Sequence, residues 1–273
     1  MRAECGSRLA EVEAKRLQVG SLHVEVYPSR EAAGAAAARA AANALTELRK
    51  TRDSIGVIFA TGASQFSTLE ALTNMQGLPW DRVCGFHMDE YIGISADHPA
   101  SFRRYLRERL TSRVAMREFF EMDGSAPDPE RTAADYAERL RAAEPQLCLL
   151  GIGENGHLAF NDPPIADFAD PVDAKVAQLD EPCRHQQVAE GWFGGLDEVP
   201  RAAITLTIPA LMRVPRLIAS VPGQRKAAIV RRTLTEPIST ACPATILRTH
   251  PDATIFLDAD SARELESLIA GRA

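Results

Sequence analysis

The stretch Gly151-Ile152-Gly153-Glu154-Asn155-Gly156-His157-Leu158-Ala159-Phe160-Asn161-Asp162-Pro163-Pro164 indicates both the fold and a site. It follows the apolar run from Gln146 to Leu150, which is typical of a buried strand in a parallel sheet. The glycines therefore fall where that strand ends, and open α/β sheets bind ligands outside the carboxyl ends of their strands. The loop also places His157 five residues before Asp162. Because a neutral imidazole held by a carboxylate can transfer protons, this pair is a candidate acid–base unit.

Apolar runs typical of strands alternate with segments typical of helices along the rest of the chain. Strands are expected at 22–27, 55–60, 83–86, 118–122, 146–150, 203–206, 216–221 and 254–257, and helices at 30–50, 100–112, 129–143, 224–234, 243–248 and 261–269. This alternation predicts a single α/β domain with a doubly wound, mostly parallel sheet over residues 20–273, after a polar leader at 1–19. Residues 166–200 lack such signals, and so long an irregular segment suggests a lid or a specificity loop.

Composition and charge exclude several classes of protein. The chain has 273 residues, a formal net charge of −6 and a pI near 5.6, and no dense basic stripe, which argues against a nucleic-acid surface. Five widely spaced cysteines without a CxxC pair indicate reduced thiols rather than disulfides or a zinc site. No signal peptide and no apolar stretch of membrane-spanning length is found. A cytoplasmic protein without a bound metal is therefore expected.

Three more segments follow predicted strands and should lie at the same edge of the sheet. Residues 61–65 form a small, hydroxyl-rich turn that can present backbone N–H groups to an anion, or else a simple glycine turn with Ser67 as the helix cap. Asp89 and Glu90 are adjacent carboxylates, so one can act as a base while hydrogen bonds hold the other; a solvated turn is the alternative. Lys226 can neutralise a phosphate or lie in a solvated first turn. The turn at residues 61–65 matches neither a GxGxxG nor a Walker A motif, so it does not indicate a nucleotide.

The order and spacing of these segments resemble the glucosamine-6-phosphate deaminase (isomerase) family. The resemblance rests on Ala60-Thr61-Gly62-Ala63-Ser64, on Phe86-His87-Met88-Asp89-Glu90-Tyr91-Ile92-Gly93, on Gly151 to Pro163, and on Gly223-Gln224-Arg225-Lys226-Ala227. It covers roughly residues 20–270 and implies the Rossmann-like three-layer sandwich of the sugar-phosphate isomerases. The implied reaction converts D-glucosamine 6-phosphate and water to D-fructose 6-phosphate and ammonia, a step of amino-sugar catabolism that needs no cofactor.

The resemblance also implies a role for each matching residue. Asp89 matches the base that moves a proton between C2 and C1 of the opened sugar, and His157 matches the acid–base group for ring opening. Asp162 stands where the family usually has a glutamate that orients this histidine, and Asn155 where members have Asp or Asn. The phosphate-binding loop and its lysine correspond to Thr61, Gly62, Ala63, Ser64, Gln65 and Lys226.

The chain departs from the family pattern near the expected phosphate site. Ala63 and Gln65 replace a glycine and a common proline, and residues 166–171 lack the Ser-x-x-Ser-Arg-Thr type of segment. Where members have a phosphate-contacting arginine before an aromatic residue, this chain has Glu190-Gly191-Trp192-Phe193. Arg184 is the candidate substitute for that arginine. The departures leave the identity of the sugar open.

Two rival functions remain. A 6-phosphogluconolactonase-type hydrolase shares the sheet, but its loop typically continues after Gly-His with Thr and a Ser-Leu-Phe-Pro run, which Leu158 to Pro163 do not match. A non-catalytic sugar-phosphate sensor would be expected to have lost Asp89 or His157, and both are present. The expected partner is a small sugar phosphate, without nucleic acid or membrane, and a homo-oligomer is left open.

Overall fold

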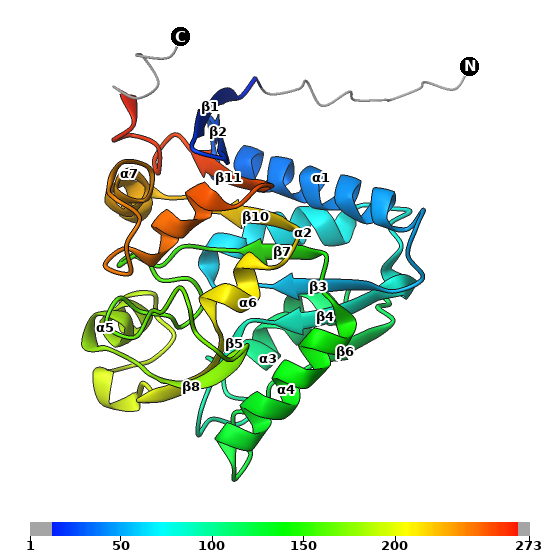
Figure 1. Cartoon of the computed structure of the whole chain (residues 1–273), viewed down its shortest axis with the longest axis vertical. Helices are drawn as coiled ribbons and strands as arrows, with labels where there is room; N and C mark the ends of the chain where they lie inside the picture. Colours follow the sequence, from blue (N-terminus) through cyan, green and yellow to red (C-terminus); the bar gives the residue numbers. More distant parts are fainter. Residues whose placement is uncertain (1–12, 267–273) are drawn as a thin grey trace.

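The computed structural model describes residues 13–266 and has a central sheet of eight strands. In spatial order these are β1 (Lys15–Val19), β2 (Leu22–Tyr27), β11 (Ala253–Asp258), β10 (Arg216–Ser220), β7 (Leu147–Leu150), β3 (Ile55–Phe59), β4 (Val83–His87) and β6 (Glu118–Phe120). All neighbours are parallel except β1, which runs antiparallel to β2. Figure 1 shows β10, β7, β3 and β4 side by side. The predicted mostly parallel sheet is confirmed.

Helices cover both faces of this sheet. The inner strands β3, β4 and β7 are buried along their whole length, which is why they are apolar without alternation. Val57 and Leu149 pack into the core under α1 (Arg30–Leu48) and α2 (Phe66–Asn74). On the opposite face, Cys148 packs into the core that includes α4 (Pro129–Ala143), α6 (Ile208–Met212) and α7 (Ala227–Thr235). The two cores make the predicted three-layer sandwich.

The long helix α1 approaches α2 closely because its packing residues are small. Its buried side chains are almost all alanines, and a β-carbon on Gly34 would lie 2.4 Å from the Cβ of Ser67. The helix begins after Ser29, whose hydroxyl accepts a hydrogen bond from the N–H of Ala32. This cap fixes the first residue of α1, Arg30, at the end of β2.

A second, three-stranded antiparallel sheet corrects the prediction for residues 166–200. It pairs β5 (Asp89–Tyr91) with β9 (Ala202–Leu206) and β9 with β8 (Ala174–Gln178). After β8 comes α5 (Glu181–Ala189), which Asp180 caps. The prediction of an irregular segment was wrong because β8 carries little strand signal and depends on pairing with a distant strand, while α5 is polar. Figure 1 shows α5 and β8 beside the main sheet.

Smaller differences concern the ends of the chain and the short helices. β1 lies within the expected leader 1–19, so residues 15–19 belong to the sheet. The helix expected at 100–112 is α3 (Phe102–Leu106) followed by a π-helical turn, Arg107–Thr111. Short 3₁₀ turns occur at Ala63–Gln65, Trp80–Arg82, Leu196–Glu198, Gln224–Lys226 and Pro243–Thr249. Of the helix expected at 261–269, residues 261–264 form turns and 267–269 lie outside the described residues.

The structure also describes four of the five cysteines and the hydropathy of the helices. Cys84, Cys148, Cys183 and Cys242 are free and buried, while Cys5 lies outside the described residues. Between residues 13 and 266, no helix is both long and apolar enough to cross a membrane.

Candidate active site

A cavity of about 550 Å³ lies at the carboxyl ends of the parallel strands. It is lined by residues 61–64 after β3, by Met88 and Asp89 after β4, by 151–154 after β7 and by 222–226 after β10. The carboxyl ends of parallel strands share one edge of a sheet, and that is why four segments distant in sequence meet there. His157 also lines the cavity.

The backbone around Asp89 is fixed by two buried side chains. The hydroxyl of Tyr136 accepts a hydrogen bond from the N–H of His87 (2.9 Å) and donates one to its carbonyl (2.8 Å). The Nε2 of His87 accepts from the N–H of Met122 at 2.7 Å, so its Nδ1 carries the proton and donates to the carbonyl of Asp89 at 2.9 Å. Burial lowers the pKa of His87 to about 3. This histidine is therefore a neutral structural residue that holds the turn bearing Asp89.

The adjacent carboxylates Asp89 and Glu90 have opposite environments. Glu90 is fully buried and accepts hydrogen bonds from the backbone of Tyr91, Phe102 and Arg103, from the hydroxyl of Ser101 and from Nε of Arg103. Asp89 is 7% exposed and lines the cavity, and its Oδ1 has no hydrogen-bond partner among the described residues. Burial, with the charge of Glu90 as the smaller cause, raises the pKa of Asp89 well above its usual value. One carboxylate thus anchors α3, and the other remains available for proton transfer.

The glycine loop after β7 holds His157 against its own backbone. A β-carbon on Gly153 would lie 2.2 Å from the imidazole ring, so only glycine fits beneath it. The N–H of Gly153 donates to the carbonyl of His157 at 3.0 Å. The side chain of Asn155 accepts from the N–H of His157 at 3.0 Å and donates to Asp162 Oδ1 at 2.9 Å. Asn155 therefore connects the histidine to its carboxylate without lining the cavity itself.

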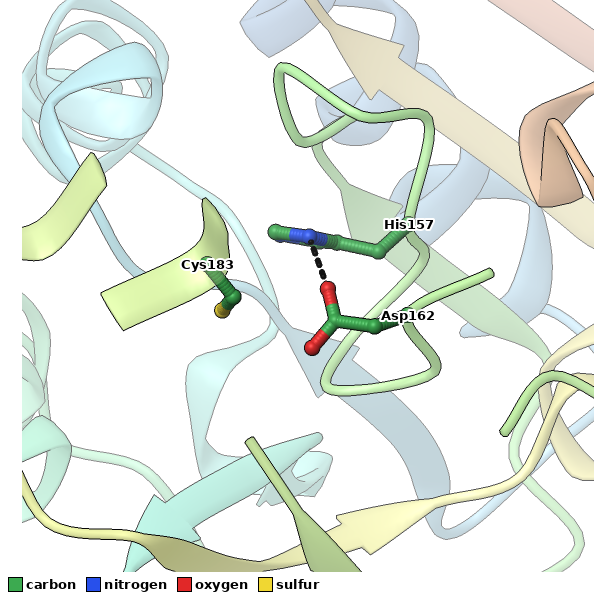
Figure 2. Close-up of side chains that lie close together, drawn as sticks. All are labelled: His157, Asp162 and Cys183. Carbon is green, nitrogen blue, oxygen red and sulfur yellow. Dashed lines mark ion pairs between the residues drawn. The ribbon is translucent and has the colours of Figure 1, made fainter. Parts of the chain in front are cut away.

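His157, which lines the cavity, forms a close pair with Asp162 (Figure 2). The Nδ1 of His157 lies 2.8 Å from Oδ1 of Asp162, whose side chain is buried. Burial alone would raise the pKa of the Asp162 carboxyl, but the imidazole and the Asn155 amide outweigh it, and the pKa lies below its usual value. Asp162 is therefore an anion that can stabilise a charged imidazolium, although its side chain is one methylene shorter than the family's glutamate.

Cys183 of α5 completes this cluster, which the sequence did not indicate (Figure 2). One possible ligand atom from each of His157, Asp162 and Cys183 lies within 4.8 Å of the others, close enough for a metal ion. A thiol must lose its proton to bind a metal, and burial raises the pKa of Cys183 far above its usual value. The protonated thiol favours a role for the cluster in proton transfer.

Small residues and one lysine also line the cavity. Gly62 adopts φ +93°, which favours glycine, and its carbonyl accepts a hydrogen bond from the hydroxyl of Tyr105 at 2.8 Å. Thr61, Ala63 and Ser64 line the cavity beside it. Lys226 lines the cavity, and its Nζ donates to the carbonyl of Ile152 at 2.7 Å. Burial lowers the pKa of Lys226.

Two residues assigned to phosphate binding from the sequence do not line the cavity. Gln65 is buried, and its amide donates to Ser64 and to the carbonyls of Leu150 and Ser220, so it joins the ends of β7 and β10. The guanidinium of Arg184 donates to the carbonyls of Leu196 and Val199, where it holds the segment after α5. Arg184 therefore does not replace the missing arginine.

Other residues that line the cavity were missed in the sequence. They are Arg30 of α1, Arg225 beside Lys226, and Gln186, Gln187, Glu190 and Trp192 at the end of α5. Glu190 accepts hydrogen bonds from Gln186 at 2.7 Å and from the indole of Trp192 at 3.1 Å. The wall formed by α5 could not be anticipated, because this helix was not predicted. Arg30 follows the strand predicted at residues 22–27, and this position after a strand could have indicated that it lies near the cavity.

The architecture and the cavity define a class of protein: a doubly wound α/β domain with a small-molecule cavity at the carboxyl edge of its sheet. The family described as glucosamine-6-phosphate isomerases/6-phosphogluconolactonase matches residues 28–256. The chain belongs to this family.

Relatives and solved structures agree with this assignment. A glucosamine-6-phosphate deaminase from an Exiguobacterium species is 36% identical over 214 residues, covering 77% of this chain and 81% of the relative. One from Corynebacterium glutamicum is 32% identical over 216 residues, covering 76% and 82%. Among solved structures, a monomeric glucosamine-6-phosphate deaminase has a TM-score of 0.81 at 28% identity, covering 88% of this chain and 99% of that one. A 6-phosphogluconolactonase from Trypanosoma brucei has a TM-score of 0.72 at 20% identity, covering 89% and 98%, and shares the fold.

Proposed function

We propose that this protein converts D-glucosamine 6-phosphate and water to D-fructose 6-phosphate and ammonia. The observation that carries the proposal is the presence of Asp89 and His157 in one cavity with the 61–64 loop and Lys226. An isomerisation of this kind needs a base, an acid for ring opening and a group that fixes the phosphate. These side chains supply all three functions within one cavity.

Asp89 is proposed as the base that moves the proton between C2 and C1. Its carboxylate lines the cavity, and no hydrogen bond among the described residues occupies its Oδ1. The raised pKa makes the ionised carboxylate a stronger base than an ordinary aspartate. The hydrogen bonds that His87 and Tyr136 make around its backbone would hold it in position during the transfer.

His157 is proposed to transfer the proton needed for ring opening. Asp162 lies 2.8 Å from Nδ1, so Nε2 is the ring nitrogen left for the substrate. The negative charge of Asp162 would stabilise the imidazolium, and Asn155 would keep both partners aligned. Asp162 and Asn155 thus act as positioning residues.

The deciding experiment is incubation of the purified protein with glucosamine 6-phosphate, followed by assay of ammonia and fructose 6-phosphate. A parallel incubation with 6-phosphogluconolactone tests the hydrolase that also occurs in the family description. Stoichiometric ammonia and ketose phosphate support the proposal. Hydrolysis of the lactone alone would assign the chain to the lactonases, and binding without turnover of either compound would assign it to sensors.

We further propose that the protein acts in the cytoplasm as one catalytic domain, which extends the expected range of residues 20–273 to include β1. Four buried free thiols suit a reducing compartment. The formal net charge of −6 disfavours binding to nucleic acid. The sugar phosphate is then the expected partner, and sedimentation of the purified protein would reveal whether it also self-associates.

A further inference from the structure

Two arginines line the cavity with their guanidinium groups unengaged. Neither Arg30 nor Arg225 makes a hydrogen bond or an ion pair with any residue between 13 and 266. Arg184, by contrast, is held by two backbone carbonyls. The Nζ of Lys226 already donates to the carbonyl of Ile152. Among the described residues of the lining, Arg30 and Arg225 are therefore the arginines whose guanidinium groups remain free to bind an anion.

Arg30 lies directly against the turn that carries Lys226. A β-carbon on Gly223 would lie 2.8 Å from Nη2 of Arg30, so the guanidinium occupies the space that the missing side chain leaves. Gly223 adopts φ +97°, and its N–H donates to both carboxylate oxygens of Asp258 at 2.9 and 3.0 Å. Asp258 thus fixes the backbone of this turn, and the turn packs against the guanidinium of Arg30.

Glu190 makes part of the cavity lining unfavourable for an anion. Glu190 stands in the segment where the resembling family has a phosphate-contacting arginine, and Gln186 and Trp192 hold its carboxylate in place. A phosphate beside Glu190 would meet a like charge. A doubly charged group would instead be stable beside the cations Arg30, Arg225 and Lys226.

We propose that Arg30 binds the substrate phosphate and replaces the arginine that the family places elsewhere. A guanidinium presents parallel N–H donors that match two phosphate oxygens, whereas Lys226 contributes a single point charge. Arg225 adds positive charge at the same end. The inference rests on the proposed function only for the identity of the sugar, since inorganic phosphate should bind at the same place.

The test compares four variants of the full chain: Arg30→Ala, Arg30→Lys, Arg225→Ala and the control Arg39→Ala. Arg39 lies on the exposed side of α1 outside the cavity, so its removal changes net charge equally. Binding of inorganic phosphate is measured by calorimetry, and KM and kcat are measured with glucosamine 6-phosphate. Arg30→Ala should weaken phosphate binding about 10- to 100-fold and raise KM similarly, with kcat less affected. Arg30→Lys should give an intermediate loss, and Arg39→Ala none.

Failure of this inference differs from failure of the proposed function. If the wild type binds phosphate through Arg30 but deaminates nothing, the phosphate site stands and the reaction is wrong. If the wild type deaminates glucosamine 6-phosphate and Arg30→Ala matches Arg39→Ala in both measurements, Arg30 is not the phosphate ligand. A loss in Arg225→Ala that exceeds the loss in Arg30→Ala would also overturn the assignment.

Discussion

Replacing Asp89 by asparagine should inactivate the enzyme and stabilise the fold. The variant keeps the size of the side chain but removes the group that accepts the proton. A positioned acid or base contributes about 10²- to 10⁴-fold in rate, so kcat should fall by that factor. Inorganic phosphate should bind normally, because the cations that line the cavity are unchanged.

The stability gain follows from the raised pKa of Asp89. Because the folded-state pKa lies above the unfolded value, this group's contribution to stability is full below the unfolded pKa and is lost as pH rises through the folded pKa. At higher pH the wild type carries a buried carboxylate whose Oδ1 has no partner in the described chain. Asparagine keeps an oxygen there but removes the charge. Each unit by which the folded-state pKa exceeds the unfolded one corresponds to about 1.4 kcal/mol at pH values above both, and one kcal/mol shifts Tm by roughly 2 to 4 °C in domains near this size.

Two measurements check this prediction. Steady-state rates of ammonia release should lose two to four orders of magnitude in the variant, as an order-of-magnitude expectation. Thermal melts of both proteins across a pH series should show a Tm advantage for Asp89→Asn that grows above the usual aspartate pKa of 3.8 and disappears below it. Near-normal turnover would refute Asp89 as the base. Loss of activity with a lower Tm at all pH values would instead indicate a structural role.

Three further predictions concern residues around the reaction. Lys226→Ala should raise KM more than it lowers kcat, and an unchanged KM in the variant would mean that Lys226 does not bind the substrate. Because burial lowers the pKa of this lysine, the KM of the wild type should already rise at alkaline pH values below 10.5. Asp162→Asn should slow turnover of the closed sugar more than turnover of an analogue already open at C1, whereas Asp162→Glu should keep activity. Equal losses on the closed and the open substrate would argue that the Asp162 carboxylate is purely structural. Tyr136→Phe removes the hydroxyl that pairs with the N–H and the carbonyl of His87, and should lower the free energy of unfolding measured in denaturant titrations by about 1 to 3 kcal/mol. A free energy of unfolding equal to that of the wild type within error would mean that water replaces the hydroxyl.

The inner strands and their site could be predicted because both depend on local signals. Strands such as β3 and β7 are continuous apolar runs, and each ends in a glycine-containing or polar segment. Parallel strands then bring those segments to one edge whatever the exact strand order. This rule was sufficient to bring Asp89, His157 and Lys226 to one cavity.

The second sheet could not be predicted because its signals are weak or distant. β8 is held in register by β9, with Ala174 opposite Leu206, so its strand conformation depends on residues far along the chain. β5 is a three-residue strand whose sequence, Asp89-Glu90-Tyr91, suggests a turn. The Glu90 carboxylate is held by the start of α3, and the Asp89 backbone by His87 of β4, contacts that form only in the folded chain.

The proposed phosphate-binding residues show how a contact that depends on the fold affects an assignment of function. The family resemblance led us to expect an arginine in the segment from Glu190 to Phe193. Arg184 was the expected substitute, but the fold directs it to the carbonyls of Leu196 and Val199. Arg30 is far from that segment in sequence. It reaches the cavity because β2 pairs with β11 and β11 with β10, an order that places the ends of β2 and β10 on the same edge. A positive charge that is absent from one loop can therefore be supplied by another loop at the same edge of the sheet. The order of the strands is needed to identify that loop.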